Sequence, residues 1–328
     1  MSMTMYDYIL EEESVLKKII REFQEYKIQA KRIKIFATGS SNNAANCVKY
    51  FMQQRLNCYV EIEEPYNFTH FSKMDDSDLA IFISQSLHSA SIIEAFHKVK
   101  RESTAKTILV SANSSSELKN QCDYFLDLNI GEEKVGFVTK GFSATVLNLI
   151  LLADSSKQCK ETLEKIVGQF PKIIKQTNDF IEEHKEILEN GKRFSCITYG
   201  DLYGVAKEFE TKFQETVRKP SSGFELEAYM HGPYLEVDEN HILFFLTDQD
   251  EIRNRANLLE NYLKPSLSFS KEFYIGDLLE QVEGEKCMKA LAFALVVQIL
   301  SCQVTKLQGI DLTIRKFDDF DQYLESKI

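Results

Sequence analysis

The chain has 328 residues, a length that fits one large domain or, more commonly, two. Its 44% hydrophobic and 27% charged residues are ordinary for a globular protein and exclude collagen-like, disordered and disulfide-scaffold classes. The net charge of −11 repels phosphodiester backbones and anionic membrane surfaces, and no run of basic residues offsets it. We therefore expect neither a nucleic acid nor a membrane as a partner.

The cysteines and the N-terminal residues bear on the cellular compartment. The seven cysteines are odd in number and at least 11 residues apart, so they predict neither a disulfide framework nor a CxxC metal site. Acidic residues 11–13 lie where a signal peptide requires a basic flank and an apolar run, and the most apolar stretch, residues 290–300, is too short to span a bilayer. We expect a cytoplasmic protein.

Taken in chain order, the first expected element is an amphipathic helix in residues 1–30. Five apolar strands follow, at residues 33–37, 59–63, 79–84, 107–111 and 124–128. Helical patterns lie between them, at residues 43–55, 90–101 and 115–121. Continuous apolar strands separated by helices are typical of a parallel sheet covered on both faces. Residues 142–190 have a helical pattern throughout, and we interpret them as a connector.

An internal repeat organises the chain. Residues 32–40 recur as residues 193–201, an offset of 161, and each copy is an apolar strand that ends at a glycine. Residues 78–84 are echoed by residues 241–247 at nearly the same offset. We therefore predict two copies of one α/β unit. The expected organisation is an N-terminal helix and two domains, at residues 1–30, 31–165 and 166–328, the connector helix belonging to the last.

Polar loops follow the first and third strands of the first copy. Residues 38–43 are Thr-Gly-Ser-Ser-Asn-Asn, and residues 84–89 are Ser-Gln-Ser-Leu-His-Ser. Hydroxyl and N–H groups at a helix N-terminus favour a phosphate group, because the helix dipole and the unsatisfied donors both attract an anion. Serine is also a common N-cap, so either loop alone fits a structural role, but two equivalent loops favour phosphate. No dinucleotide or nucleoside triphosphate motif is present.

The second copy has acidic residues in the corresponding loops, at residues 201, 248 and 250, which would repel phosphate. We therefore expect the first copy to bind the anion and the second to supply catalytic groups. Glu208, Lys212 and Glu215 recur on one helix face. A Glu–Lys pair four residues apart is also common as a solvated pair that only stabilises a helix. His231 precedes Gly-Pro and so belongs to a turn, where either a functional or a structural role is possible.

These motifs together resemble the sugar isomerase (SIS) family, from about residue 30 to residue 310. The resemblance is to the isomerase half of glucosamine-6-phosphate synthases and to Amadori-compound deglycases such as the fructoselysine-6-phosphate deglycases. It is carried by Gly39-Ser40-Ser41-Asn42, by Ser84-Gln85-Ser86, by residues 135–142, and by Glu215 with His231-Gly232-Pro233 sixteen residues later.

The resemblance implies two tandem flavodoxin-like SIS domains, each a parallel sheet with helices on both faces. It implies a phosphorylated sugar or sugar-amine as substrate and a homodimer or higher homo-oligomer with sites near the subunit interface. The residues implied to bind substrate are Gly39, Ser40, Ser41, Ser84, Gln85, Ser86, Ser89 and Lys140. Glu215 would be the catalytic carboxylate, Lys212 its neighbour, and His231 the proton relay, supplied by its own or a neighbouring subunit.

The implied chemistry suits these residue types. Moving a carbonyl between C1 and C2 of an open-chain sugar needs one base that removes a proton from one carbon and returns it to the other. A glutamate whose pKa is raised by partial burial can do both, and a histidine can exchange protons with the ring oxygen or a leaving amine near neutral pH. We expect this chemistry to require neither a metal nor a cofactor.

Two departures from the synthase pattern bear on which activity we expect. Residues 87–89 are Leu-His-Ser where synthases have Gly-Glu-Thr, and the tail after residue 309 shows no recognisable proline-containing segment or closing lysine. We also expect no glutamine-hydrolysing half. The expected enzyme is a deglycase that cleaves a 6-phosphorylated Amadori-type sugar-amine, similar to fructoselysine 6-phosphate, to hexose 6-phosphate and amine. The alternatives are an aldose–ketose or aminosugar-phosphate isomerase/deaminase, and a non-catalytic phosphosugar-binding module.

Overall fold

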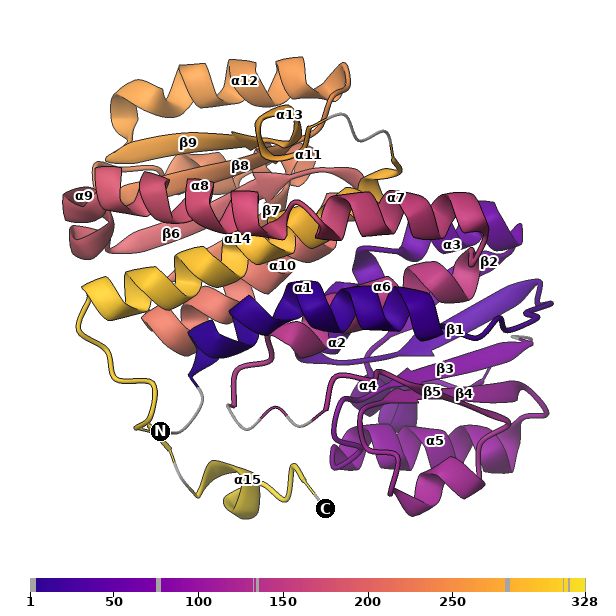
Figure 1. Cartoon of the computed structure of the whole chain (residues 1–328). Coiled ribbons are helices and arrows are strands. Elements are labelled where there is room, and N and C mark those ends of the chain that lie inside the picture. Colours follow the sequence, from indigo (N-terminus) through magenta and orange to yellow (C-terminus); the bar gives the residue numbers. More distant parts are fainter. Residues whose placement is uncertain are drawn as a thin grey trace.

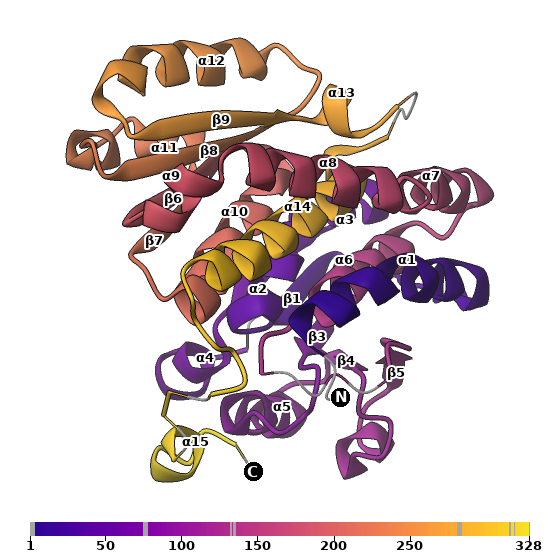
Figure 2. The same ribbon diagram turned by 60° about the vertical axis from the view of Figure 1, so that its left-hand side comes forward.

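Two parallel sheets lie on either side of a shared layer of helices (Figures 1 and 2). The computed structural model describes residues 4–74, 78–131, 133, 136–280, 284–314, 316–317 and 319–327. The first sheet has the order β2-β1-β3-β4-β5 and consists of β1 (Arg32–Phe36), β2 (Tyr59–Glu63), β3 (Leu79–Ile83), β4 (Lys106–Ser111) and β5 (Tyr124–Asp127). The second has the order β7-β6-β8-β9 and consists of β6 (Arg193–Thr198), β7 (Ser221–Glu225), β8 (His241–Thr247) and β9 (Phe269–Tyr274).

All strand pairs in both sheets are parallel, which confirms the α/β class and the duplicated unit. The repeated segments form the central strands β1, β3, β6 and β8. Every residue of β3 and β8 is buried, because helices cover both faces of each sheet. The bounds of the five strands expected in the first copy agree with those in the structure to within about one residue at each end.

Fifteen α-helices are described, and several are short. Their bounds are α1 (Met5–Glu22), α2 (Gly39–Asn46), α3 (Lys49–Leu56), α4 (Pro65–Phe71), α5 (Ala90–Glu102), α6 (Lys140–Ala153), α7 (Lys157–Val167), α8 (Phe170–Glu183), α9 (Lys185–Asn190), α10 (Tyr203–Lys212), α11 (Leu226–Tyr229), α12 (Ile252–Leu263), α13 (Ile275–Leu278), α14 (Lys286–Leu307) and α15 (Phe320–Tyr323). A π-helical turn, Phe213–Val217, continues α10.

Four sequence expectations about helices need correction. Residues 43–55 belong to two helices, α2 and α3, and residues 115–121 contain only the short 3-10 helix Glu117–Asn120. α1 ends at Glu22, so residues 23–30 are not helical. Residues 142–190 form four helices rather than one, because Ser156 caps the start of α7 and Pro171 marks the first turn of α8. Helix α4 was not expected. The proposed domain boundary at residue 165 falls within α7.

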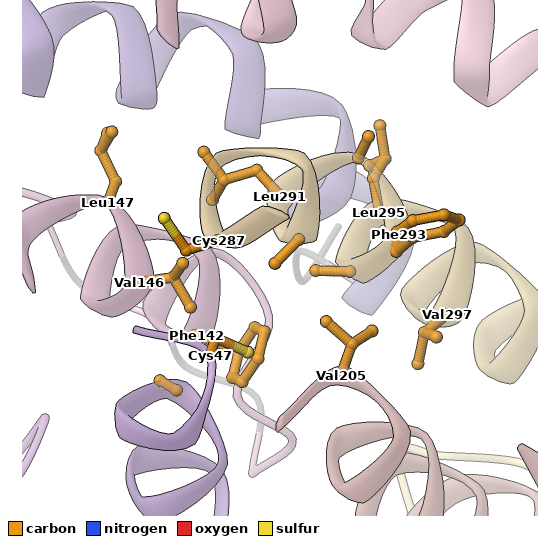
Figure 3. Packing of buried hydrophobic residues seen from close by; sticks show 14 of the residues in the cluster. Cys47, Phe142, Val146, Leu147, Val205, Cys287, Leu291, Phe293, Leu295 and Val297 are labelled. Atoms are coloured by element: carbon orange, nitrogen blue, oxygen red, sulfur yellow. The ribbon is translucent and has the colours of Figure 1, made fainter. Parts of the chain in front are cut away.

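α14 joins the two halves of the molecule. Figure 3 shows its side chains, among them Leu291 and Leu295, in one cluster with Val146 of α6 and Val205 of α10. Of the helices in the described residues, α14 is the one with the length and hydropathy of a membrane span, yet 83% of its most apolar window is buried inside the protein. It is thus the core helix, and both sheets pack on the same hydrophobic core.

α2 and α10 approach closely across the boundary between the two halves (Figure 2). Gly204 makes this possible, because a Cβ at this position would overlap the carbonyl oxygen of Asn43 and come within 2.5 Å of Cys47 Sγ. A small residue at this position therefore has a structural purpose. The close packing of the two helices brings the end of α10 to the start of α2.

Candidate active site

The candidate site lies at the carboxyl ends of β1 and β3, where the strand order of the first sheet reverses. From β1 the chain crosses to β2 at one side, and from β3 it crosses to β4 at the other side, so the connections that follow β1 and β3 run in opposite directions. Ligands of open parallel sheets bind in the crevice at such a reversal. α2 and α5 begin at this edge, and the residues at their N-termini are 38–43, here called the first serine loop, and 84–89, the second serine loop.

The first serine loop contacts the second half of the molecule. Gly39 has a φ of 55°, a left-handed conformation that favours glycine, and it turns the chain from β1 into α2. Ser40 Oγ donates a hydrogen bond of 3.0 Å to Glu208 Oε1, and Asn43 Nδ2 donates one of 2.9 Å to Glu208 Oε2. Ser41 is half-buried in the same turn. The serines predicted to bind phosphate therefore lie beside the helix predicted to carry catalysis.

Glu208, Lys212 and Glu215 form one ion-pair network. Lys212 Nζ is 2.6 Å from Glu215 Oε2 and 3.5 Å from Glu208 Oε1. The side chains of Lys212 and Glu208 are 0% and 1% exposed, whereas that of Glu215 is 37% exposed. The three side chains share one helix face, as their spacing predicted. Solvent, and hence a substrate, can reach Glu215 alone among them.

The electrostatics of this network keep Lys212 charged. Burial would lower the pKa of Lys212, but the carboxylates of Glu208 and Glu215 outweigh burial and raise it. Burial raises the pKa of Glu208, and the Lys212 ammonium together with the hydrogen bonds from Asn43 and Ser40 offsets part of that effect. A fixed positive charge beside an accessible carboxylate can stabilise an oxyanion that forms in front of it.

Replacement of Lys212 is expected to destabilise the protein strongly. Lys212→Met leaves Glu208 buried without its counter-charge, which costs about 3–5 kcal/mol of unfolding free energy. Lys207→Met is the matched control, because Lys207 lies on the same helix in a half-exposed pair with Glu210 that is worth about 0–1 kcal/mol. Urea denaturation measures both. Equal stability of the two variants would show that the Lys212 network does not hold α10 in place.

The second serine loop folds back on itself at the start of α5. Ser84 Oγ accepts a hydrogen bond of 3.1 Å from Leu87 N, and Ser86 Oγ accepts one of 3.3 Å from His88 N. Ser89 occupies the N-cap position, and its side chain makes no capping hydrogen bond. Hydroxyl groups thus surround a helix N-terminus, the arrangement that suits a phosphate group.

Gln85 and Lys140 have different partners. Gln85 Nε2 donates to Glu133 Oε2 at 2.9 Å, and Glu133 Oε1 accepts from Thr139 N at 2.8 Å, so the second serine loop is tied to the start of α6. Lys140 Nζ instead pairs with Glu11 Oε2 of α1 at 2.7 Å. The structure therefore directs the Lys140 ammonium toward α1. Of the motif at residues 135–142, Val135 lies outside the described residues.

The C-terminal tail crosses the same edge of the molecule (Figures 1 and 2). Arg218 Nη2, three residues after Glu215, donates to Ile314 O at 3.2 Å. Farther along, Lys327 pairs with Ser89 in an isolated antiparallel bridge, and Lys327 Nζ lies 2.7 Å from an Asp321 carboxylate oxygen. The tail thus brings a lysine to the second serine loop, although none could be recognised from the sequence.

His231 lies away from this cluster within one chain. It occupies the predicted turn, after β7 and α11, and is exposed. Glu215 precedes β7, and Gln214 Nε2 donates to Ser221 O at the start of that strand. A five-residue strand is about 16 Å long, so Glu215 and His231 lie at opposite ends of β7.

Ion pairs occupy the corresponding loops of the second sheet. Asp248 Oδ1 is 2.7 Å from Lys289 Nζ, and Asp250 Oδ2 is 2.5 Å from Lys286 Nζ. Burial raises the pKa of Asp201 to about 7. The acidic loops of the second copy are therefore neutralised by α14 rather than open to an anion. A cavity of about 1200 Å³ lies at the opposite edge of the first sheet, beside Lys31 and Lys106, and is not part of the site.

Comparison with known families concerns the first half of the chain. Residues 28–154 match the SIS domain. This part of the chain is a SIS domain. The matched residues contain all five strands of the first sheet and both serine loops, so the resemblance inferred from those loops is confirmed.

Relatives of this SIS-domain protein extend the similarity to its second half. The glutamine–fructose-6-phosphate aminotransferase (isomerizing) of Thermotoga maritima is 24% identical over 311 residues, which are 88% of this chain and 51% of that protein. The chain therefore spans about half the length of the aminotransferases it matches.

Solved structures agree on the tandem fold. A candidate phosphosugar isomerase from Clostridium difficile 630 superposes with a TM-score of 0.89 at 26% identity, covering 100% of this chain and 99% of that one. A glucosamine-6-phosphate deaminase from Thermotoga maritima superposes with a TM-score of 0.79 at 20% identity, covering 94% and 96%. Both similarities extend over both sheets, so the tandem SIS-like arrangement is a property of the whole chain.

Four parts of the site were not assigned a role from the sequence. Glu208 was noted for its spacing, but its contact with Ser40 depends on the packing of α2 on α10. Glu133 stands six residues before Thr139, a separation that is not a recognisable capping pattern. The C-terminal tail has no motif. A signal existed for Asn43 alone, which follows Ser40 by three residues and so shares its face of α2.

Proposed function

We propose that this protein is a phosphosugar isomerase-type enzyme that transfers a proton between C1 and C2 of an open-chain sugar phosphate. The observation that carries the proposal is the network of Glu208, Lys212 and Glu215 beside the first serine loop. It places an accessible carboxylate, able to act as the base, next to a buried ammonium that stabilises an enediolate. The serine loops would hold the phosphate.

The proposed reaction balances within the substrate. Glu215 removes a proton from C2 of the aldose, and the C1 carbonyl oxygen takes a proton as the enediol forms. Glu215 then returns its proton to C1, and the C2 hydroxyl gives up its proton as the carbonyl appears at C2. When C2 bears an amino group, the same shift gives a C2 imine, and water converts this imine to ketose phosphate and ammonia. Both variants use one base and no oxidant or reductant.

The relatives favour this reaction over the deglycase activity expected from the sequence. Their names describe an isomerizing aminotransferase, a candidate phosphosugar isomerase and a glucosamine-6-phosphate deaminase. Cleavage of a sugar-amine would begin with the same proton transfer. A deglycase therefore remains a second outcome of the test below.

We further propose that the working unit is a homodimer in which His231 of a second copy completes the site. Support comes from the geometry of one chain, in which His231 and Glu215 lie at opposite ends of β7. Leu235, four residues after His231, is a large apolar side chain that is 75% exposed. A surface that exposes such a side chain fits a second copy.

Incubation with fructose 6-phosphate in deuterated water tests the proposed function. We expect deuterium to enter the sugar at C1 or C2, detected by proton NMR, and no incorporation with unphosphorylated fructose. Glucosamine 6-phosphate should release ammonia if the aminosugar variant is correct. Release of hexose phosphate from fructoselysine 6-phosphate would instead establish the deglycase. Absence of exchange and of release from every substrate would overturn the enzymatic proposal and leave a binding module.

A further inference from the structure

Glu12 of α1 is a buried carboxyl group without a cation of its own; its polar neighbours are the neutral side chains of Ser143 and Gln298. The residue is 0% exposed, and among the described residues neither carboxyl oxygen accepts a hydrogen bond. The cation that acts on Glu12, the Lys140 ammonium, is engaged by the preceding residue, Glu11, at 2.7 Å. The other charged group that faces Glu12 is the carboxylate of Glu133. The charged groups around Glu12 are therefore a carboxylate of like charge and a lysine that is already neutralised.

A second orphaned acceptor lies in the same place. Gln298 of α14 donates from Nε2 to Thr139 O and to Ser143 Oγ, each at 3.2 Å, while its Oε1 is buried without a donor. Ser143 and Gln298 are the polar side chains next to Glu12. α1, α6 and α14 thus meet at three acceptor atoms, the two Glu12 oxygens and Gln298 Oε1, and the Ser143 hydroxyl offers them a single hydrogen, so donors are too few. A proton on Glu12 supplies the missing donor.

Desolvation makes this proton favourable. An ionised carboxylate buried without a cation is costly, and such groups take up a proton instead. Burial is the main reason that the pKa of Glu12 rises to about 8, and the Glu133 carboxylate adds to the rise, while Ser143, Gln298 and Lys140 oppose it. Glu12 is therefore a neutral acid in the folded protein below this pH.

The start of α6, which Gln298 holds, also holds the second serine loop. Thr139 N donates to Glu133, and Glu133 accepts in turn from Gln85 Nε2. Gly141 packs so tightly on the Gln85 side chain that a Cβ would come within 2.7 Å of Gln85 Oε1. A displacement of α6 at this point would be transmitted to Gln85.

We propose that Glu12, as a neutral carboxylic acid, is a positioning residue that fixes the start of α6 through Gln298 and thereby fixes the second serine loop. The inference rests on the proposed function for the meaning of that loop. It gives α1, which provides none of the candidate substrate contacts, a part in the geometry of the site.

The sign of the pH dependence follows from the raised pKa. Below about pH 4.5, the ordinary pKa of a carboxyl group, Glu12 is protonated whether the start of α6 is closed or open. Its full stabilisation of the closed state is then present. Between about 4.5 and 8 the opened state loses its proton while the closed state keeps it, so opening becomes easier as pH rises. Above about pH 8 Glu12 no longer stabilises the closed state, and opening stops depending on pH.

Hydrogen–deuterium exchange on the protein without ligand tests this inference. After correction for the intrinsic exchange rate, amides in residues 139–148 and 84–90 of the unaltered protein should open at least about tenfold more readily at pH 8 than at pH 6. Glu12→Gln, which keeps the shape and supplies an N–H donor without titrating, should abolish the dependence. Glu13→Gln is the matched control, since Glu13 pairs with Lys17 at the surface and should leave the dependence unchanged.

The outcomes separate this inference from the proposed function. An unaltered protein with no pH dependence in residues 139–148 overturns the inference whether or not Glu12→Gln folds, and so does a dependence that survives in that variant. Fructose 6-phosphate affinity at pH 9 should be several-fold weaker for the unaltered protein than for Glu12→Gln, and equal at pH 6. Failure of both proteins to bind fructose 6-phosphate at any pH would refute the proposed function, while the exchange result without ligand still decides the state of Glu12.

Discussion

Glu215→Gln is expected to lower turnover by about 10²–10⁴-fold, the contribution typical of a positioned acid–base group. The amide cannot take a proton from C1 or C2, but it keeps the size of the side chain and can still accept a hydrogen bond from Lys212. Phosphosugar affinity should change little, because the serine loops do not depend on the Glu215 charge. Deuterium incorporation measures the first quantity, and the ligand-induced rise in melting temperature measures the second.

The matched control is Glu210→Gln, a change on the same helix. Glu210 pairs with Lys207 and accepts from Gly223 N, and an amide oxygen can keep the latter bond. This variant should retain turnover. Equal loss of turnover and affinity in Glu215→Gln would show that Glu215 has a structural role, and unchanged turnover would show that the base is another group.

Mixing two inactive variants is expected to restore activity if His231 acts across a dimer. Glu215→Gln supplies an intact His231, and His231→Ala supplies an intact Glu215. In a symmetric dimer each mixed pair contains one complete site of two, so random exchange of subunits should recover about a quarter of the unaltered activity. The measurement is deuterium exchange after the two proteins are unfolded together and refolded. The recovered activity should rise with the fraction of mixed dimers.

The physical reason for this expectation is the length of β7, which separates the two residues in one chain. His231→Ala refolded alone is the control and should stay inactive. If the mixture has no more activity than its components, while subunit exchange is shown by mass spectrometry of a tagged copy, His231 does not act from a second copy. A fully active His231→Ala protein would remove this residue from the mechanism.

Local patterns in the sequence were sufficient for the strands and for the first half of the site. Apolar runs predicted β3 and β8 because both faces of each strand are covered, and the resulting pattern does not depend on the neighbours in detail. The serine loops could be recognised because they follow these strands directly. Helix ends were less predictable: α1 ends at Glu22, where its C-terminal turn is not marked by glycine.

Contacts between segments distant in the chain could not be predicted. Glu208 and Ser40 are 168 residues apart, and their hydrogen bond exists because Gly204 lets α10 approach α2. Glu12 and Gln298 come together because α1 packs across α6 and α14. A spacing on one helix indicates that side chains share a face, but it does not say what faces them. Burial and partner charge, which set the pKa of each carboxyl group, therefore stayed undetermined.

Composition alone made the protein acidic and gave it room for two domains, and the repeat divided that length into two similar units. The order of residues along the chain was enough to predict the two units, because strand patterns, loop residues and repeats can be read directly from it. The tertiary structure decided that one unit's serines meet the other unit's glutamates, that the acidic loops are neutralised by α14, and that His231 lies away from Glu215. These relations depend on packing between distant segments, which no local pattern encodes.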